Sequence, residues 1–543
     1  MKSKLYKSLL LFIVVVLVMM GIARVASASK PAQVGVSADT NWSALEKAPR
    51  FLKEVEGAGF KWQEGKFSFY DLIKAACEKR IFTAMGNNPW PNAYFTLQIP
   101  NPEDANYKLP YSLMWQMRQD EAIVLIGQTP PNIRYFSFQS WVQLSPPSVV
   151  DPDHVLANRS LIGSAFGDTI NNLTINTIGP DPYNRPIVYI ITANKQTEQR
   201  VRKVVLNAGF PQAIINVEHL STAIAPLGIG PEGSILIMSM RNAVPTDQTA
   251  FEEYVRLSID DDPLNGPFRV FRITPSQEFA PDPYPVPKLR VRGTGQSELD
   301  LFPALKSLEK AIIAKEGSRT PSLAYKKLTG RFWQDPMESG QIEWIDEPWV
   351  GMQIGNYSYL GSRDTNYIQT YPYFKLRSDV DEYVIVYGVN HQRTGKTTYT
   401  SFSVYVEPTF GTGREIGLGS VTDPNYDAGG NPGDSARRYL QPDDPYYKDA
   451  DMLYAWKIAR HCAPEDMPFC LEVGNPKYIN GVPYNNNCDP QINLEIDPNR
   501  PDWSSDVFVV FRGYMEPATA VSPDSNELVW DKAIYFGPYF QQP

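Results

Sequence analysis

Hydrophobic and polar positions follow the same pattern in two distant stretches of the chain. Residues 120–142 (DEAIVLIGQTPPNIRYFSFQSWV) and 381–406 (DEYVIVYGVNHQRTGKTTYTSFSVYV) each begin with Asp-Glu and continue as an apolar run that ends in Gly. Each then crosses a polar turn and returns as alternating aromatic and small polar residues. Because successive side chains of a strand point to opposite faces, each stretch is predicted to form a β-hairpin with one buried face.

A second pair of similar segments follows these two stretches. Phe268–Arg272 (FRVFR) precedes Pro275, and Phe508–Arg512 (FVVFR) precedes Pro517. Two ordered matches predict tandem copies of one β-rich domain. The expected fold class is therefore α+β and mainly β, with two related antiparallel β-sandwich-like domains. The first is expected to carry an α/β insertion, and the second a disulfide-bearing insertion.

The predicted domain boundaries follow changes of pattern along the 543 residues, a length that exceeds what one hydrophobic core usually serves. Asn194 is expected to cap the start of a helix in the first insertion, and Gly209 to end it. A further helix is predicted near Asp451–Arg460. The predicted parts are a helical lead-in (29–86), a first β-rich domain (87–278) with its insertion (about 151–239), a Pro/Gly linker (279–297), a connecting helix (298–329), and a second β-rich domain (330–543) with its insertion (about 411–499).

The N-terminus has the order of a secretory signal peptide. Three lysines precede the apolar run Leu9–Ala23, and the small-residue triplet Ala26-Ser27-Ala28 follows. This order predicts export with cleavage after Ala28, so that residues 1–28 are removed and no stable membrane span remains. The alternative is an uncleaved anchor, although the run is shorter than the roughly 20 residues that span a bilayer. The expected location is periplasmic or extracellular.

Four cysteines occur: Cys77, Cys462, Cys470 and Cys488. In an exported protein an even number of cysteines predicts disulfides, and four allow three pairings. The pairing favoured here is Cys462–Cys470 with Cys77–Cys488, and the alternative is four buried thiols. Without a Cys-x-x-Cys pair, a zinc ribbon or a thioredoxin-like site is disfavoured.

The charge of the chain argues against two classes of partner. The net charge is −9, and the sequence has no cluster of Lys and Arg. Binding to nucleic acid or to anionic lipid depends on such positive charge, so neither partner is expected. A small-molecule or polymer ligand is the expected partner, and the oligomeric state stays open.

Histidine chemistry has few candidates, because the chain contains only four histidines. No Gly-x-Ser-x-Gly, His-x-His or His-Glu-x-x-His motif occurs, which disfavours an α/β-hydrolase or a preformed zinc site. His391 and Arg393 lie in the polar turn of the second repeated stretch, where the first stretch has Pro130 and Pro131. They are candidate ligand-binding residues, and the alternative is an ordinary solvated turn.

The segment from Glu343 to Trp349 (EWIDEPW) places carboxylates between tryptophans. Glycoside hydrolysis uses a pair of carboxylates, one protonated and one charged. If the protein is an enzyme, Glu343, Asp346 and Glu347 are the catalytic candidates. The alternative is an edge strand with exposed acids and core tryptophans. The candidate ligand-binding residues in and after this segment are Trp344, Trp349, Tyr357, Tyr359, Arg363 and Tyr367.

A loop rich in oxygen donors is a candidate calcium site. Asp423, Asn425, Asp427 and Asp434 are spaced as Ca²⁺ ligands in a tight loop. The loop departs from the EF-hand pattern, because Ala428 stands where glycine is needed and Asp434 replaces the bidentate Glu. The alternative is a plain turn, and no other cofactor is expected.

Together these patterns predict an exported two-domain protein that binds an extracytoplasmic ligand or polymer, with a glycan as the candidate ligand. One alternative is a glycan-acting hydrolase that uses paired carboxylates. Another is a structural or assembly protein of the cell envelope.

Overall fold

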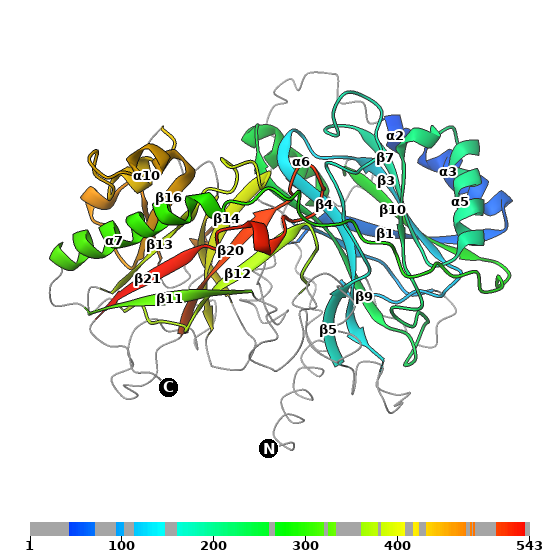
Figure 1. Ribbon diagram of the computed structural model, residues 1–543. Coiled ribbons are helices and arrows are strands. Elements are labelled where there is room, and N and C mark those ends of the chain that lie inside the picture. The colour runs from blue at the N-terminus through cyan, green and yellow to red at the C-terminus, as the bar shows by residue number, and fades with distance from the viewer. Residues whose placement is uncertain are drawn as a thin grey trace, which may run out of the picture.

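The chain is mainly β in the computed structural model, with two large sheets side by side (Figure 1). No helix among the described residues is long and apolar enough to cross a membrane. The predicted signal at residues 1–28 lies outside the described residues. The structure describes residues 43–70, 94–102, 113–146, 160–259, 266–319, 324–332, 360–377, 382–407, 416–422, 431–473, 478–479, 482–483 and 506–537.

The first sheet has the strand order β5-β4-β9-β2-β1-β10-β3-β7-β8, with β6 paired to β4 outside this path. Its neighbouring strands are antiparallel except β7 and β8, which run parallel. The strands are β1 (Phe60–Phe69), β2 (Tyr94–Gln98), β3 (Ala122–Gln128), β4 (Ile133–Ser145), β5 (Ser160–Ala165), β6 (Ile170–Asn171), β7 (Pro186–Thr192), β8 (Ile215–His219), β9 (Ile235–Pro245) and β10 (Phe268–Pro275).

The second sheet has the order β15-β14-β20-β12-β11-β21-β13-β16-β17. Here β16 and β17 form the parallel pair. A separate small sheet joins β18 (Tyr478–Ile479) to β19 (Val482–Pro483). The large sheet consists of β11 (Ala324–Phe332), β12 (Thr365–Tyr371), β13 (Tyr383–Val389), β14 (Tyr399–Glu407), β15 (Ile416–Thr422), β16 (Leu453–Ala459), β17 (Cys470–Glu472), β20 (Asp506–Tyr514) and β21 (Lys532–Gly537).

The two nine-strand paths have the same topology. Taken in chain order, each strand of the first path has a counterpart at the same place in the second, including the parallel edge pair. The register also matches at one polar position. Ser137 and Tyr94 lie opposite Arg241 on the two sides of β9, and Ser401 and Tyr367 lie opposite Arg512 on the two sides of β20.

The repeated stretches form strands, but the predicted hairpins are wrong. β3 pairs with β10 and β7, whereas β4 pairs with β5, β6 and β9, so four strands separate β3 from β4 in the sheet. β13 and β14 are separated in the same way. β3 and β13 are also buried along their whole length, which explains their continuous apolar runs.

Two further sequence expectations are wrong. Phe268–Arg272 lies in β10, whose counterpart is β21, whereas Phe508–Arg512 lies in β20, whose counterpart is β9. These two segments are therefore not equivalent. The helix predicted near Asp451–Arg460 is the fully buried strand β16, because a short apolar run between two packed layers suits a strand.

Most helices cover the outer sides of the two sheets, whereas α6 (Gln248–Ile259) lies between the halves and packs in the apolar layer of β4 and β9 (Figure 1). In α5, the side chain of Asn194 accepts a hydrogen bond from the amide of Thr197 at 3.0 Å, as predicted for a capping residue. Gly209 follows with φ 91°, a conformation that favours glycine. The helices are α2 (Ser43–Glu46), α3 (Ala48–Gly57), α5 (Lys195–Asn207), α6 (Gln248–Ile259), α7 (Phe302–Arg319) and α10 (Asp434–Arg437), with 3₁₀ turns η1 (Gln212–Ile214), η2 (Leu299–Leu301), η4 (Tyr447–Met452), η5 (Pro464–Asp466) and η6 (Ser525–Glu527).

Each half has two apolar layers, one on each face of its sheet. In β3, Ile123 and Leu125 pack with residues of β4 and β9, whereas Val124 and Ile126 pack under α3 and α5. The same alternation occurs in β13, whose residues pack either against β14 and β20 or under α7. β3 and β13, each a continuous apolar run in the sequence, therefore contribute side chains to the apolar layers on both faces of their sheets.

One predicted disulfide is confirmed. Cys462 and Cys470 are bonded at an S–S distance of 2.03 Å, next to the parallel pair β16 and β17. Cys77 and Cys488 lie outside the described residues, so their pairing stays a prediction.

Replacing Cys462 and Cys470 together by serine is expected to lower the free energy of unfolding by about 2–3 kcal/mol. The bond closes a short loop, with a sequence separation of 8, and removes conformational freedom from the unfolded chain. Urea unfolding of the two proteins measures the difference. A midpoint that stays unchanged at constant m value would contradict the expectation.

Candidate functional site

Several predicted site residues lie outside the described part of the chain. They include the candidate carboxylates Glu343, Asp346 and Glu347 and three of the four candidate calcium ligands, Asp423, Asn425 and Asp427. The aromatic residues Trp344, Trp349, Tyr357 and Tyr359 lie outside it as well. The roles predicted for these residues stay predictions. The described candidates are Arg363, Tyr367, His391, Arg393 and Asp434.

Arg363 lies in the contact between the two halves. Its side chain is buried, and its Nε donates to Asp168 Oδ1 at 2.7 Å. Its Nη2 donates to the carbonyl of Arg290 in the segment that links the halves. The guanidinium therefore joins the second half to the first half and to the linker.

Asp364 enters a polar pocket formed by the first half. Its carboxylate accepts hydrogen bonds from Tyr135 Oη, Thr169 Oγ1 and Arg241 Nη2, each at 2.8 Å. Burial alone would raise the pKa of this carboxyl, but the charge of Arg241 and the donated hydrogen bonds hold it below its usual value. Asp364 and Arg241 thus form a fully buried ion pair across the contact.

Arg512 occupies the equivalent position in the second sheet. Its Nη1 donates to Ser403 Oγ at 2.9 Å and its Nη2 to Tyr405 Oη at 2.6 Å. The ring of Tyr367 lies 5.8 Å from the Arg512 guanidinium, and its Oη accepts from Arg241 Nη1 at 3.4 Å. Tyr367 therefore lies between the two equivalent arginines, one from each half.

An aromatic row runs beside this contact; we use the name for Tyr367, Tyr373, Tyr405 and Phe508. Tyr373 stacks on Phe508 with ring centroids 4.7 Å apart, and Phe508 in turn stacks on Tyr405 at 5.6 Å. Tyr405 and Phe508 are buried, whereas Tyr367 and Tyr373 are only partly buried and pack over them. The partly buried rings of Tyr367 and Tyr373 therefore lie over the buried rings of Tyr405 and Phe508.

Polar atoms without a hydrogen-bond partner adjoin the row. Arg512 and Ser401 are cross-strand neighbours and are about 98% buried or more, and among the described residues neither Arg512 Nε nor Ser401 Oγ has a partner. Gln139 Oε1 and Thr96 Oγ1 are two further cases in the first sheet. Buried polar groups normally form hydrogen bonds, so these atoms offer donors and acceptors to a ligand or to water.

His391 lies between two carboxylates rather than in a solvated turn. Its Nδ1 is 2.9 Å from Glu298 Oε2, and its Nε2 is 3.3 Å from Asp531 Oδ2. Burial alone would lower its pKa, but the two carboxylates outweigh burial and raise the pKa to about 10. The imidazole is therefore held as a cation that donates from both nitrogens, and it is not a general base near neutral pH. Its predicted role in ligand binding stays a prediction.

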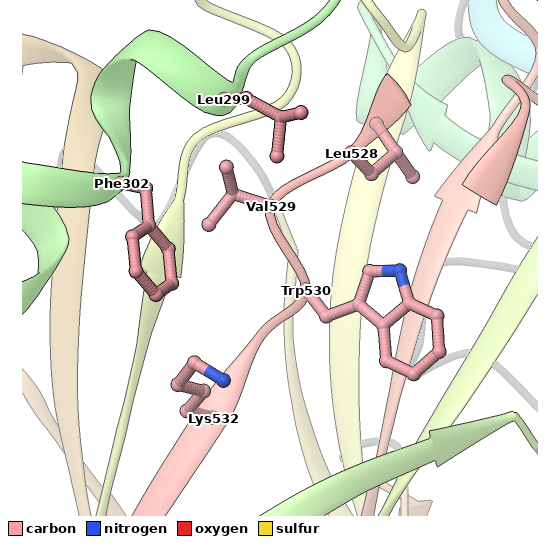
Figure 2. A pocket seen from close by; sticks show the side chains of 6 residues that line it. All are labelled: Leu299, Phe302, Leu528, Val529, Trp530 and Lys532. Carbon is pink, nitrogen blue, oxygen red and sulfur yellow. The ribbon is translucent and has the colours of Figure 1, made fainter. Parts of the chain in front are cut away.

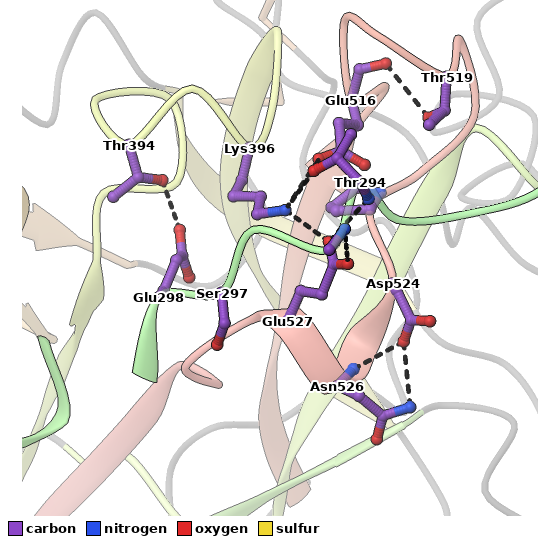
Figure 3. A network of polar contacts seen from close by, with 12 residues as sticks. Thr294, Ser297, Glu298, Thr394, Lys396, Glu516, Thr519, Asp524, Asn526 and Glu527 are labelled. Carbon is purple, nitrogen blue, oxygen red and sulfur yellow. Dashed lines mark hydrogen bonds and ion pairs between the residues drawn. The ribbon is translucent and has the colours of Figure 1, made fainter. Parts of the chain in front are cut away.

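The neighbouring polar contacts tie the linker to the second half (Figure 3). Thr394 donates to Glu298, which also accepts from the amide of Val529. Lys396 Nζ contacts Glu516 at 2.9 Å and Glu527 at 2.5 Å, and it lies 3.1 Å from the hydroxyl of Thr294. A network of alternating charges thus fixes the end of the linker.

The two remaining candidates lie apart from these clusters. Arg393 is exposed in its turn, and Asp434 begins the short helix α10, where it accepts from the amide of Asn431 at 3.3 Å. Within the described ranges, no group of three or more His, Cys, Asp or Glu residues is arranged to hold a metal ion.

The sequence interpretation missed the residues that organise these clusters. Arg241 is the single charged residue of β9, and Arg512 is the single basic residue of β20, in strands that are otherwise mostly apolar or small, a signal that could have marked both as buried polar residues. Glu298 and Asp531 are 93 and 140 residues from His391, so no local pattern connects them. No family model matches this chain, and no curated protein is detectably similar to it.

Proposed function

We propose that this protein is exported and binds an extracytoplasmic ligand of the carbohydrate class at the aromatic row. The observation that carries the proposal is the stack of Tyr373 on Phe508, which continues through Tyr405 to Arg512 and Ser401, whose Nε and Oγ atoms have no hydrogen-bond partner in the described part of the chain. Sugars present apolar CH faces and hydroxyl groups, and binding sites for such ligands combine aromatic surface with a few placed polar groups. Export rests on the charged, apolar and small-residue order of residues 1–28.

We also propose that the two halves are related domains that derive from one ancestral unit. The shared strand order and the matching positions of Arg241 and Arg512 support this relation. Each half then contributes an equivalent strand with a buried arginine to the contact between the halves. The proposed binding site beside Tyr367 includes both of these strands. A glycan-acting hydrolase and an envelope assembly protein stay as alternatives from the sequence.

Replacing Tyr373 by alanine is expected to weaken retention of the protein on its polysaccharide by about 10-fold, because one stacking face is lost. Affinity electrophoresis through gels that contain a panel of polysaccharides measures this change. The matched control is Tyr325→Ala. This half-exposed tyrosine packs against Phe536 on β21, a residue of the apolar layer under α7, and should leave retention unchanged.

Other outcomes of the same panel separate the alternatives. Turnover of a polysaccharide that Glu343→Gln abolishes, while retention survives, would favour the hydrolase. If no polysaccharide in the panel retards the protein, the proposal of carbohydrate binding is wrong, and the result favours the role in envelope assembly.

A further inference from the structure

An apolar pocket lies where the linker meets the second half. Its cavity is about 200 Å³. One wall comes from the 3₁₀ turn η2 and the start of α7, and the other from the segment that leads into β21 (Figure 2). The lining residues are Leu299, Phe302, Leu528, Val529, Trp530 and Lys532.

The pocket has a closed base and an open mouth. Leu528 and Val529 are buried, whereas Leu299 and Phe302 are 58% and 42% exposed. The indole NH of Trp530 donates to the carbonyl of Ser525 at 2.9 Å, which holds the ring in place as a side wall. Water can therefore reach the opening, while the interior offers aliphatic and aromatic surface.

Lys532 is the single charged residue of this lining. Figure 2 shows its amino group pointing into the space between Phe302, Val529 and Trp530. Within the described ranges it forms no hydrogen bond and no ion pair. Half-buried lysines usually direct their ammonium group to water or to a carboxylate, so an ammonium aimed at an apolar pocket indicates a missing anionic partner.

The nearby charges do not supply this partner. Glu309 already pairs with Lys327 at 2.6 Å and with Lys306 at 3.4 Å, and it accepts from Tyr387. Asp531 faces His391 and Tyr454 instead. Burial is the main cause that lowers the pKa of Lys532, and Lys306 adds to it, whereas the charges of Glu309 and Asp531 only partly oppose this effect.

We propose that this pocket binds a small ligand with an apolar body and one carboxylate, and that the carboxylate pairs with the ammonium of Lys532. A cavity of about 150 Å³ accommodates benzene, so the volume here suits a single ring or a chain of about six carbons. Charge-assisted hydrogen bonds are stronger than neutral ones, particularly where water is partly excluded. The site is separate from the aromatic row and does not depend on the carbohydrate proposal.

Isothermal titration calorimetry of the full chain with hexanoate and with hexan-1-ol tests the proposal. Hexanoate is expected to bind at least about 10-fold more tightly than the alcohol, because both probes fill the cavity but only one carries a charge. In Lys532→Met this preference should disappear, whereas Lys532→Arg should keep it. Lys53→Met, at an exposed position on α3 in the first half, is the matched control and should bind as the wild type does.

Occupancy of the cavity itself is tested by Leu299→Trp, which places a large ring at the exposed mouth and should abolish binding of both probes. Thermal unfolding of each variant verifies that the fold is retained. Absence of saturable hexanoate binding up to about 10 mM would overturn the proposal. Equal affinity for the two probes, or a preference that survives in Lys532→Met, would overturn it as well.

Discussion

Replacing Asp364 by asparagine is expected to lower the free energy of unfolding by about 3–5 kcal/mol, because the change leaves the buried guanidinium of Arg241 without its counter-charge. The carboxylate also accepts hydrogen bonds from Tyr135 and Thr169, so the effect extends to both halves. Urea unfolding followed by tryptophan fluorescence measures the loss.

The control for this change is Asp181→Asn. Asp181 pairs with Arg185 at 3.2 Å, but both side chains are substantially exposed, and such pairs contribute at most about 1 kcal/mol. The double variant Arg241→Met with Asp364→Leu removes both charges and is expected to cost less than Asp364→Asn alone. A loss of less than about 1 kcal/mol for Asp364→Asn would show that the pair does not hold the halves together.

Replacing His391 by glutamine is expected to have an effect of similar size, about 3–5 kcal/mol near neutral pH. The change leaves Glu298 and Asp531 buried without the cation between them. His461→Gln is the control, because His461 is exposed, and that change should alter stability by less than about 0.5 kcal/mol.

The effect of His391 should depend on pH with a defined sign. Its pKa in the folded protein, about 10, lies above the usual value of 6.5, so the folded state binds this proton more tightly than the unfolded state does. The stabilisation is fully present below pH 6.5 and is lost as the pH rises toward 10. The wild type and His391→Gln should therefore converge in stability at high pH. A constant difference from pH 6 to pH 10 would argue that packing, rather than charge, explains the effect.

The sequence predicts which segments form strands better than it predicts which strands pair in the sheet. The apolar run in β3 and the alternating run in β4 were identified correctly as strands, because side-chain periodicity is a local property. Their pairing was not, because four strands from elsewhere in the chain lie between them. A polar turn such as Thr129–Asn132 looks the same whether it closes a hairpin or carries the chain to another part of a sheet.

The candidate sites show the same limit. Arg363 and His391 stood out in the sequence as polar residues suited to ligands, yet the structure surrounds both with charges from distant segments. Asp168 is 195 residues from Arg363, so only the folded chain reveals their ion pair. By contrast, Asn194 and Cys462 were predicted correctly because their partners lie within a few residues.

The place of β21 in the second sheet has a consequence for how this protein is made. β21 lies between β11 and β13, near the middle of the sheet, although it is the last strand of the described chain. Synthesis delivers it after the other strands that the structure describes in this sheet, so the second core stays open until Gly537 has left the ribosome. For the proposed export, this order would give an export machinery time to engage the chain before its second half folds.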